Sequence, residues 1–250
     1  MMPLDDRGLL LGDGLFETIL AKDGELILFE QHIERLQASC MALGLSAPYL
    51  NDTRALCQSM LDDFEPGAAR AAVRLTMTAG SGGRGLERPA ETEPHIFASV
   101  TPSPRPIGAV NLVTSEVRRN EGSPASRLKT LSYIDNVLAR YAASPAEALL
   151  LNNRQEIACA AAANIFWVRG GKLFTPHLDC GVLNGIMRQQ VLAVAEVEEV
   201  RAPRAMLEGA DAVFLTNSLV GVRPVATLDG APLRTHPFVE RLIAALADVS

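Results

Sequence analysis

Hydrophobic and polar residues alternate in some stretches of the chain and recur at helical spacing in others. In the first hundred residues, "LFETILAKDGELILF" predicts two strands around a turn at Asp23 and Gly24, and "EQHIERLQASCMALGL" predicts an amphipathic helix that ends at Gly44. A second helix is predicted around residues 53–64. The stretches "ARAAVRLTMTAG" and "PHIFASV" are typical of strands. Together these elements predict a small mixed α/β domain.

A proline-rich stretch separates this half from the next. "TPSPRPIGA", residues 101–109, contains three prolines and a glycine between patterns that are strand-like on both sides, which is typical of a linker. We therefore predict a small N-terminal α/β domain at residues 1–103, a linker at 104–109 and a larger domain at 110–250.

The second half also mixes strands with helices. The stretches typical of strands are "VNLVTSEV", "EALLLN", "EIACAAAANIFWV", "KLFTP" and "AVFLTNS", and those typical of amphipathic helices are "NGIMRQQVLAVAEV" and "HPFVERLIAALADV". A further helix is predicted to begin at Lys129 and to pack into the core. Its apolar residues recur at helical spacing: Leu131, Ile134, Val137, Leu138 and Tyr141. The predicted fold class is therefore α/β (α+β), with two unequal domains.

Composition and charge exclude several classes of protein. The 250 residues are 48% apolar, enough for one large core or two moderate ones. The net charge of -6, without a basic stripe, argues against nucleic acid as a partner. Apolar runs are too short to cross a membrane and the first residues lack a signal pattern, so we expect a cytoplasmic protein. No metal site is expected, because the cysteines have no paired spacing: Cys40, Cys57, Cys159 and Cys180.

Lysine is rare in this chain, which draws attention to Lys129. The only other lysines, Lys22 and Lys172, adjoin glycine-containing turns, where side chains are solvated. A lysine attacks a carbonyl only as the neutral amine, whose formation is favoured by desolvation or a nearby positive charge. The edge of a predicted core offers desolvation. The alternative is a lysine that extends from a helix end into solvent. An imine-forming cofactor such as pyridoxal phosphate would also need an anion site and a partner for its pyridine nitrogen.

Two stretches are candidates for the anion site. "LNGIMRQQV" has a glycine directly before a helix, which places the amides of Ile186 and Met187 at the positive end of the helix dipole. "LTNSLVG" ends a strand with hydrogen-bond donors, including Ser218. Arg35 in "HIERL" could add a charged contact, although an arginine on an amphipathic helix is often only solvated.

Taken in order, seven blocks of the sequence resemble a known family. The blocks are "GDGLFET", "HIERL", "GSGGRG", "KTLSYIDNVLAR", "AANIFW", "LNGIMRQ" and "NSLVGVRPV". They are similar to class IV, fold-type IV pyridoxal-phosphate enzymes, which include branched-chain and D-amino-acid aminotransferases and 4-amino-4-deoxychorismate lyase. The resemblance runs from about Gly12 to Val225. It implies pyridoxal phosphate as cofactor, a small-molecule substrate and a homodimer.

The resemblance also implies a role for individual residues. Lys129 matches the catalytic lysine that holds the cofactor as an imine and then moves protons. The matches to the cofactor-binding positions are Arg35, Asn164, Ile186, Met187 and Ser218. Arg84 in "GSGGRG" and Arg118 in "SEVRRN" match positions that could bind substrate carboxylates, with a surface arginine as the alternative.

Cys159 departs from the family pattern. Five residues before Asn164, where the family has a glutamate that keeps the pyridine nitrogen protonated, this chain has a cysteine. On a regular strand Glu156 would face the opposite side and could not replace it. A small cysteine can also simply fill space in a core.

Three hypotheses about function follow from this departure. "GSGGRG" and "NSL" favour the lyase, which releases pyruvate and forms 4-aminobenzoate for folate synthesis. An aminotransferase would depend more on the lost glutamate, because no aromatic product drives its reaction. The third hypothesis is a cofactor-binding protein with lost or altered activity.

Overall fold

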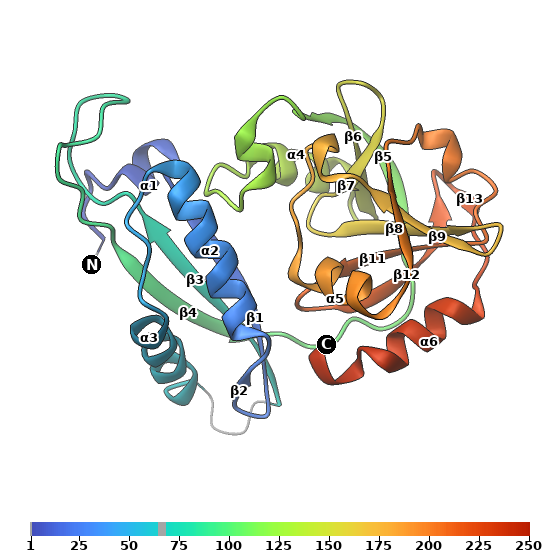
Figure 1. Cartoon of the computed structure of the whole chain (residues 1–250), viewed down its shortest axis with the longest axis horizontal. Coiled ribbons are helices and arrows are strands. Elements are labelled where there is room, and N and C mark those ends of the chain that lie inside the picture. The colour runs from blue at the N-terminus through green and yellow to red at the C-terminus, as the bar shows by residue number, and fades with distance from the viewer. Residues whose placement is uncertain (1, 65–68) are drawn as a thin grey trace. The chain divides into compact units, whose positions relative to one another are not determined.

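The computed structural model describes residues 2–64 and 69–250. The chain forms two compact units, shown in Figure 1. Unit 1 consists of Met1–Pro104 together with Leu128–Ser132, and unit 2 of Arg105–Arg127 together with Tyr133–Ser250. The domains expected from the sequence are continuous, so they differ from these units chiefly in the short segment Leu128–Ser132, which carries Lys129.

Unit 1 is an antiparallel sheet covered by helices. Its strand order is β2-β1-β3-β4, with β1 at Gly14–Lys22, β2 at Glu25–Leu26, β3 at Arg70–Thr78 and β4 at Ile96–Pro102. The helices are α1 (Arg7–Leu11), α2 (Phe29–Leu43) and α3 (Leu50–Asp62). Helices α2 and α3 lie on the same face of the sheet (Figure 1), and both contribute to one apolar core.

The α2 helix shows how the sequence pattern produces this packing. Phe29, Ile33 and Leu36 recur at helical spacing and are fully buried against the sheet. Burying each such side chain stabilises the fold by about 1.5–3 kcal/mol. The helix ends where Gly44 adopts a left-handed conformation with φ of 66°, as the sequence predicts.

Unit 2 is built on a nine-stranded mixed sheet. Its strand order is β10-β9-β8-β11-β12-β5-β6-β7, with β13 paired to β12. The strands are β5 (Val110–Arg119), β6 (Glu147–Asn152), β7 (Ile157–Ala160), β8 (Asn164–Arg169), β9 (Lys172–Pro176), β10 (Val197–Val200), β11 (Ala212–Asn217), β12 (Gly221–Leu228) and β13 (Ala231–Pro232). The helices are α4 (Ile134–Ala143), α5 (Ile186–Val194) and α6 (Pro237–Ala245).

Each helix of unit 2 covers a different part of this sheet. Helix α4 packs on β5 and β6, α5 packs on β11, and α6 packs on β12. Neighbouring residues of β11 face opposite sides, because Val213 and Leu215 belong to one apolar cluster and Phe214 to another. Within residues 2–64 and 69–250, no helix is long and apolar enough to cross a lipid bilayer.

The structure corrects the prediction of a helix beginning at Lys129. Lys129 is extended and pairs with the edge of β1: the amide of Phe16 donates to the carbonyl of Lys129 (2.9 Å), and the amide of Leu131 donates to that of Gly14 (3.0 Å). Helix α4 begins only at Ile134. Strand pairing therefore overrides the local helical pattern.

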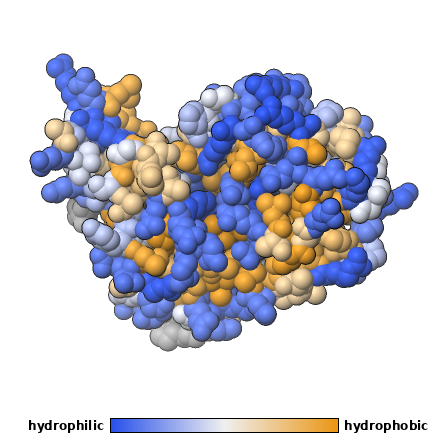
Figure 2. All heavy atoms as spheres, viewed as in Figure 1, coloured by the Kyte–Doolittle hydropathy of each residue, from blue (hydrophilic) through white to orange (hydrophobic). Residues whose placement is uncertain are grey.

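The prediction that the apolar residues of this helix pack into the core is also wrong. Ile134 is 63% exposed and Tyr141 is 82% exposed, and Val137 and Leu138 are exposed as well. These residues form an apolar face on α4 that is directed away from the core of unit 2. Figure 2 shows hydrophobic areas among hydrophilic ones on the visible surface.

One predicted strand is divided in two. "EIACAAAANIFWV" forms β7 and β8, joined by a tight turn in which the amide of Ala160 donates to the carbonyl of Ala163 (2.8 Å). The end of the stretch "NGIMRQQVLAVAEV", which the sequence predicts as helix, enters strand β10.

Candidate active site

Lys129 lies beside an aromatic ring in unit 1. Its Nζ is 4.1 Å from the centroid of the Phe16 ring, which contributes a cation–π contact. The guanidinium of Arg74 lies 3.8 Å from the same centroid. The pairing of Lys129 with β1 fixes its backbone. The half-buried lysine side chain is therefore held close to Phe16 and Arg74.

Glu17, directly after Phe16 on β1, is the centre of a buried ionic cluster. Its carboxylate accepts a hydrogen bond from Nε of Arg35 (2.8 Å) and also pairs with Nη2 of Arg35. Nδ1 of His32 lies 2.7 Å from the same carboxylate. We call Glu17, His32 and Arg35 the Glu17 cluster. Burial alone would raise the pKa of Glu17, but Arg35 and His32 lower it to about 2.

His32 connects this cluster electrostatically with Lys129. Burial lowers the pKa of His32, and the positive charges of Arg35 and Lys129 lower it further, although the Glu17 carboxylate opposes them. A neutral His32 donates its Nδ1–H to Glu17, because an ionised carboxylate can only accept. Glu17 and His32 were not among the residues predicted from the sequence. An acidic residue inside an apolar strand and the His-Arg pair three positions apart on a helix were the available signals.

Unit 2 presents an anion-binding arrangement at the start of α5. Asn164 on β8 is paired with Thr216 on β11, so their side chains project from the same face of the sheet. Nδ2 of Asn164 donates to the carbonyl of Leu183 (2.9 Å). A Cβ added at Gly185 would lie only 2.1 Å from Oδ1 of Asn164, so glycine is required there. Asn164 thus fixes the loop that leads into α5.

The amides at this helix start are available for an anion. Gly185 precedes the nine-residue α5 and provides no side-chain cap, and the first amides of a helix have no partner within the helix. Ile186 and Met187, which provide two of them, are almost fully buried. The partial positive charge of the helix N-terminus favours a bound anion.

Thr216 supplies a second donor near these amides. Its side chain is 1% exposed, and its Oγ1 has no hydrogen-bond partner within the described residues. A buried unsatisfied hydroxyl costs about 1–3 kcal/mol, which a bound acceptor would offset. We call Asn164, Gly185, Ile186, Met187 and Thr216 the α5 cradle. Its donor set fits a phosphate group. Thr216 was not among the predicted site residues, although it belongs to the stretch "LTNSLVG".

Ser218 lies close to Thr216 in the chain. It is half-buried in the turn that follows β11. Oδ1 of Asn217 accepts hydrogen bonds from the amides of Leu219 (3.1 Å) and Val220 (2.9 Å), which fixes the conformation of this turn. The structure therefore places predicted residues Asn164, Ile186 and Met187 together, with Ser218 two residues beyond the cradle.

Cys159 lies on a strand with a β-bulge. Its partner on β6 is Leu150, whereas the next residue, Leu151, pairs with Ile157, so Ala158 is the extra residue. Ala158 and Cys159 consequently belong to the same apolar cluster, which also contains Cys180.

The bulge corrects the expectation that Glu156 faces the side opposite to Cys159. Sγ of Cys180 lies 3.6 Å from Oε2 of Glu156, and Cys180 belongs to the cluster of Cys159. However, the same carboxylate oxygen also accepts a hydrogen bond from Nδ2 of Asn152 (2.7 Å). Glu156 therefore shares the face of Cys159 but is already engaged by two neighbours.

The thiol at position 159 is uncharged at neutral pH. Burial raises the pKa of Cys159, and the positive charge of Arg119 only partly opposes this effect. Nε of Arg119 donates to the carbonyl of Gly181 (2.9 Å), and its Nη2 contacts the carbonyl of Ser126. Arg119 was not predicted as a site residue; its neighbour Arg118 was.

The two predicted substrate-binding arginines lie on different units. Arg118 on β5 is half-buried and donates from Nη1 to the carbonyl of Ser115 (2.5 Å). Arg84 is exposed at a turn of unit 1, in which the amide of Glu87 donates to the carbonyl of Arg84 (3.1 Å). Within residues 2–64 and 69–250, the Arg84 guanidinium has no ion-pair or hydrogen-bond partner.

The mixed α/β fold, the half-buried Lys129 and the α5 cradle agree with a family that is defined by sequence. Residues 14–228 match the model of the family described as amino-transferase class IV. The chain belongs to this family. The predicted family and fold class are thereby confirmed.

Individual relatives differ in the activity for which they are named. The chain is 34% identical to a putative branched-chain-amino-acid aminotransferase of Methanocaldococcus jannaschii, covering 90% of this chain and 82% of the relative. It is also similar to the crystal structure of 4-amino-4-deoxychorismate lyase from Pseudomonas aeruginosa. That similarity has a TM-score of 0.89 and 29% identity, over 99% of this chain and 95% of the other.

A third similarity concerns a structure with a bound cofactor. A hypothetical aminotransferase from Mycobacterium tuberculosis in a PLP-bound form matches with a TM-score of 0.86 and 25% identity, over 99% of this chain and 92% of the other.

Proposed function

We propose that this protein is a pyridoxal-phosphate-dependent 4-amino-4-deoxychorismate lyase, which eliminates pyruvate to give 4-aminobenzoate. The family and the lyase from P. aeruginosa support this activity. The observation that carries the choice within the family is Cys159, a buried uncharged thiol where the resemblance leads one to expect a carboxylate.

The proposed cofactor is pyridoxal phosphate, which members of this family use and which the M. tuberculosis structure contains. When bound, it supplies an aldehyde that forms an imine with an amine and a ring that withdraws electrons from the adjacent carbon. We propose Lys129 as the amine that binds it. The α5 cradle, Ser218 and Arg35 are proposed to bind its phosphate.

The surrounding residues would prepare these groups for their roles. Glu17 holds the Arg35 guanidinium through two nitrogen atoms, which fixes its orientation. Asn164 holds the loop before α5 and thereby aims the amides of Ile186 and Met187. Lys129, as a neutral amine, would accept the proton from the substrate carbon that bears the amine. Arg84 and Arg118 are proposed to bind the substrate carboxylates.

Cys159 favours the lyase for a chemical reason. A neutral thiol does not stabilise positive charge on a pyridine nitrogen as a carboxylate would, so the ring withdraws electrons less strongly. The lyase reaction forms an aromatic ring as pyruvate leaves, and this driving force reduces the need for electron withdrawal. Transamination has no comparable driving force.

Pyruvate release tests the proposal. Protein loaded with pyridoxal phosphate should release pyruvate from 4-amino-4-deoxychorismate, and Lys129→Ala should abolish the release. Circular dichroism spectra should show that the variant is folded. A folded, cofactor-loaded wild-type protein that releases no pyruvate would exclude the lyase.

An aminotransferase is the second candidate function. The observation in its favour is the 34% identity to the putative branched-chain-amino-acid aminotransferase of M. jannaschii. It predicts amino-group transfer from L-branched-chain or D-amino acids to 2-oxoglutarate or pyruvate. If a panel of these amino acids leaves the visible spectrum of the cofactor unchanged, this candidate is excluded.

We also propose that the protein is a cytoplasmic homodimer. The family resemblance suggests the dimer. The exposed apolar face of α4, formed by Ile134, Val137, Leu138 and Tyr141, supports it, because apolar patches of this kind mark protein–protein contacts.

A further inference from the structure

Arg7 is a buried arginine that contacts the backbone of a distant turn. It lies in α1 and is 4% exposed. Its Nη1 donates to the carbonyls of Gly82 (3.4 Å), Gly85 (3.4 Å) and Glu87 (2.9 Å), and its Nη2 donates to that of Leu86 (3.1 Å). One guanidinium therefore contacts four carbonyls of residues 82–87, with its shortest hydrogen bonds to Leu86 and Glu87, and we call this segment the 82–87 turn.

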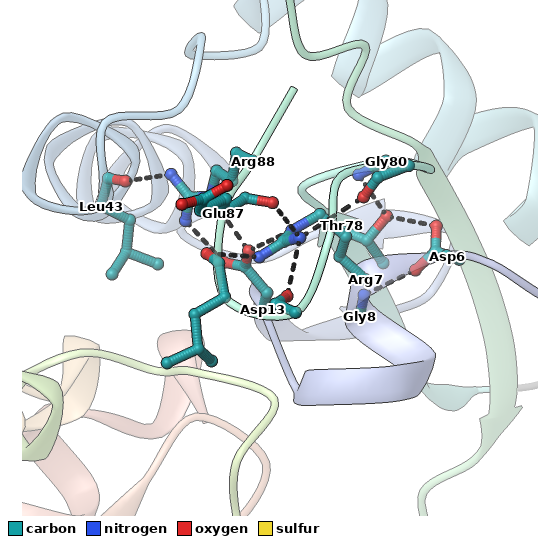
Figure 3. A network of polar contacts seen from close by, with 12 residues as sticks. Asp6, Arg7, Gly8, Asp13, Leu43, Thr78, Gly80, Glu87 and Arg88 are labelled. Atoms are coloured by element: carbon teal, nitrogen blue, oxygen red, sulfur yellow. Dashed lines mark hydrogen bonds and ion pairs between the residues drawn. The ribbon is translucent and has the colours of Figure 1, made fainter. Parts of the chain in front are cut away.

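Asp13 fixes the position of this guanidinium. Its Oδ2 accepts hydrogen bonds from Nε of Arg7 (2.9 Å) and Nε of Arg88 (3.0 Å), and its Oδ1 pairs with Nη2 of Arg88 (2.5 Å). Arg88 also donates from Nη1 to the carbonyl of Leu43 at the end of α2 (2.5 Å). Figure 3 shows Asp13 between the two arginines. The pKa of Asp13 is lowered, chiefly by Arg88, so this anion persists at neutral pH.

Gly83 allows the guanidinium to approach the turn this closely. Its φ is 83°, and an added Cβ would lie 2.9 Å from Nη1 of Arg7 and 2.2 Å from the carbonyl oxygen of Glu87. Any side chain at this position would displace either the arginine or the turn. By contrast, a Cβ at Gly85 would meet no atom within 4 Å.

These contacts hold a segment that has, within the described part of the chain, one backbone hydrogen bond of its own, from the amide of Glu87 to the carbonyl of Arg84. The 82–87 turn is mostly exposed, and four of its backbone carbonyls are held by a single side chain. Arg84 is in this turn, exposed and without an ion-pair partner among the described residues. A guanidinium presented from a fixed backbone loses less conformational entropy when it binds a carboxylate than one on a mobile loop.

We propose that Arg7 is a positioning residue for Arg84: with Asp13 and Arg88 it holds the 82–87 turn so that Arg84 is presented to a substrate carboxylate. The role of Arg84 as the carboxylate-binding residue belongs to the proposed function, on which this inference rests. The holding of the turn by Arg7 can be tested separately.

Limited proteolysis tests the order of the turn without any activity measurement. Trypsin cleaves after Arg84, whereas the bond after Arg88 is followed by Pro89 and resists it. Arg7→Lys keeps the positive charge and the trypsin site but loses the planar fork that reaches several carbonyls. We expect cleavage after Arg84 to accelerate about tenfold relative to cleavage elsewhere in the chain. Arg54→Lys, in an exposed pair with Glu30, is the matched control and should leave the rate unchanged.

A pair of glycine variants disrupts the same contact by another route. Gly83→Ala should accelerate cleavage after Arg84 as Arg7→Lys does, because the added methyl group displaces the guanidinium. Gly85→Ala places a side chain at a similarly positive φ (59°) but in open space, so it reproduces the backbone strain without the clash with Arg7 and should accelerate cleavage less than Gly83→Ala. Because the 82–87 turn is exposed, both glycine variants should fold even if Arg7→Lys does not.

Steady-state kinetics with 4-amino-4-deoxychorismate test whether the loss of Arg7 weakens substrate binding by Arg84. Arg7→Lys should raise KM about tenfold while kcat stays within about twofold, as Arg84→Ala should. The KM of the double variant should equal that of Arg84→Ala alone, because both changes remove the same interaction with the substrate carboxylate.

Each outcome bears on a different step. Unchanged cleavage in both Arg7→Lys and Gly83→Ala would overturn the proposal, and so would faster cleavage with a KM equal to that of the wild type or with effects that add in the double variant. If the wild-type protein has neither lyase nor aminotransferase activity, the proposed function fails, and the cleavage rates still decide whether Arg7 holds the turn.

Discussion

Thr216 helps to distinguish an anion site from ordinary packing in unit 2. Its hydroxyl is buried and has no hydrogen-bond partner within the described residues, which is unfavourable for folding alone, and its strand neighbour Asn164 holds the loop before α5. By contrast, the buried hydroxyl of Thr175 donates to the carbonyl of Ile165 (2.9 Å). The two threonines therefore predict opposite effects of the same substitution.

Thr216→Val should raise the free energy of unfolding of the cofactor-free protein by about 1 kcal/mol and weaken pyridoxal phosphate binding about tenfold. Stability should rise because the substitution removes an unsatisfied buried hydroxyl. Cofactor binding should weaken because the same hydroxyl is a proposed donor to the phosphate. Denaturant unfolding and absorbance titration measure them. Thr175→Val, the control, should destabilise the protein. A loss of stability in both variants would contradict the role of Thr216.

A second prediction concerns the substitution of Cys159. Cys159→Glu should raise any aminotransferase activity about fivefold or more, because a carboxylate would support a protonated pyridine nitrogen. Arg119 provides a positive charge near this position that favours the ionised glutamate. Cys159→Gln, which is similar in size but uncharged, should produce no increase. A fall or no change with glutamate would show that position 159 does not contact the ring.

At the scale of elements, the Glu17 cluster connects β1 to α2. Glu17 lies on the strand, whereas His32 and Arg35 lie on the helix that covers it. Breaking a buried pair by removing one partner leaves an uncompensated charge and is strongly destabilising. The cluster therefore ties α2, with the proposed phosphate-binding Arg35, to the strand beside Lys129.

This connection predicts a pH dependence of stability. The pKa of Glu17 is about 2 in the folded state, below its ordinary value of 4.5, so its ionisation stabilises the fold above pH 4.5 by about 3 kcal/mol. This contribution declines as pH falls from 4.5 towards 2. We expect the stability difference between wild type and Glu17→Gln to shrink by about half between pH 7 and pH 3. A difference independent of pH in denaturant unfolding would contradict the pairing.

Most elements followed from sequence because their pattern and their ends agree. Helix α2 combines periodic apolar residues with a C-terminal Gly44, and β1 is joined to β2 by the Asp23-Gly24 turn. The segment at Lys129 did not follow from the sequence, because it pairs with residues of β1 that lie more than a hundred positions away. Local periodicity also cannot distinguish an apolar face that packs on a core from one that remains exposed, as on α4.

For the candidate site, the sequence proposes the main residues but not the residues that support them. Family resemblance gave Lys129, Arg35 and the start of α5. Glu17, His32 and Thr216 were missed because their significance lies in contacts across strands and helices. The bulge at Ala158, which puts Glu156 on the face of Cys159, had no sequence signal, since alanine fits a regular strand equally well.

At the scale of the whole molecule, the exposed face of α4 predicts the oligomeric state. Sedimentation should show a dimer, and Val137→Glu should convert it to a monomer because it places a charge in an apolar contact. Ile107→Glu is the matched control: Ile107 is 97% exposed and lies outside α4, so the dimer should persist. A monomeric wild type, or a dimer that survives Val137→Glu, would contradict this arrangement.

The central claim is that Lys129 binds pyridoxal phosphate. The chain offers a built-in comparison, because its only other lysines are Lys22, at the end of β1, and Lys172, whose pKa is raised by Glu198 and which therefore stays protonated. Borohydride reduction of the protein with pyridoxal phosphate, followed by mass spectrometry of peptides, locates the adduct. We predict one adduct, on Lys129. No adduct there, or equal labelling of the three lysines, would contradict the account.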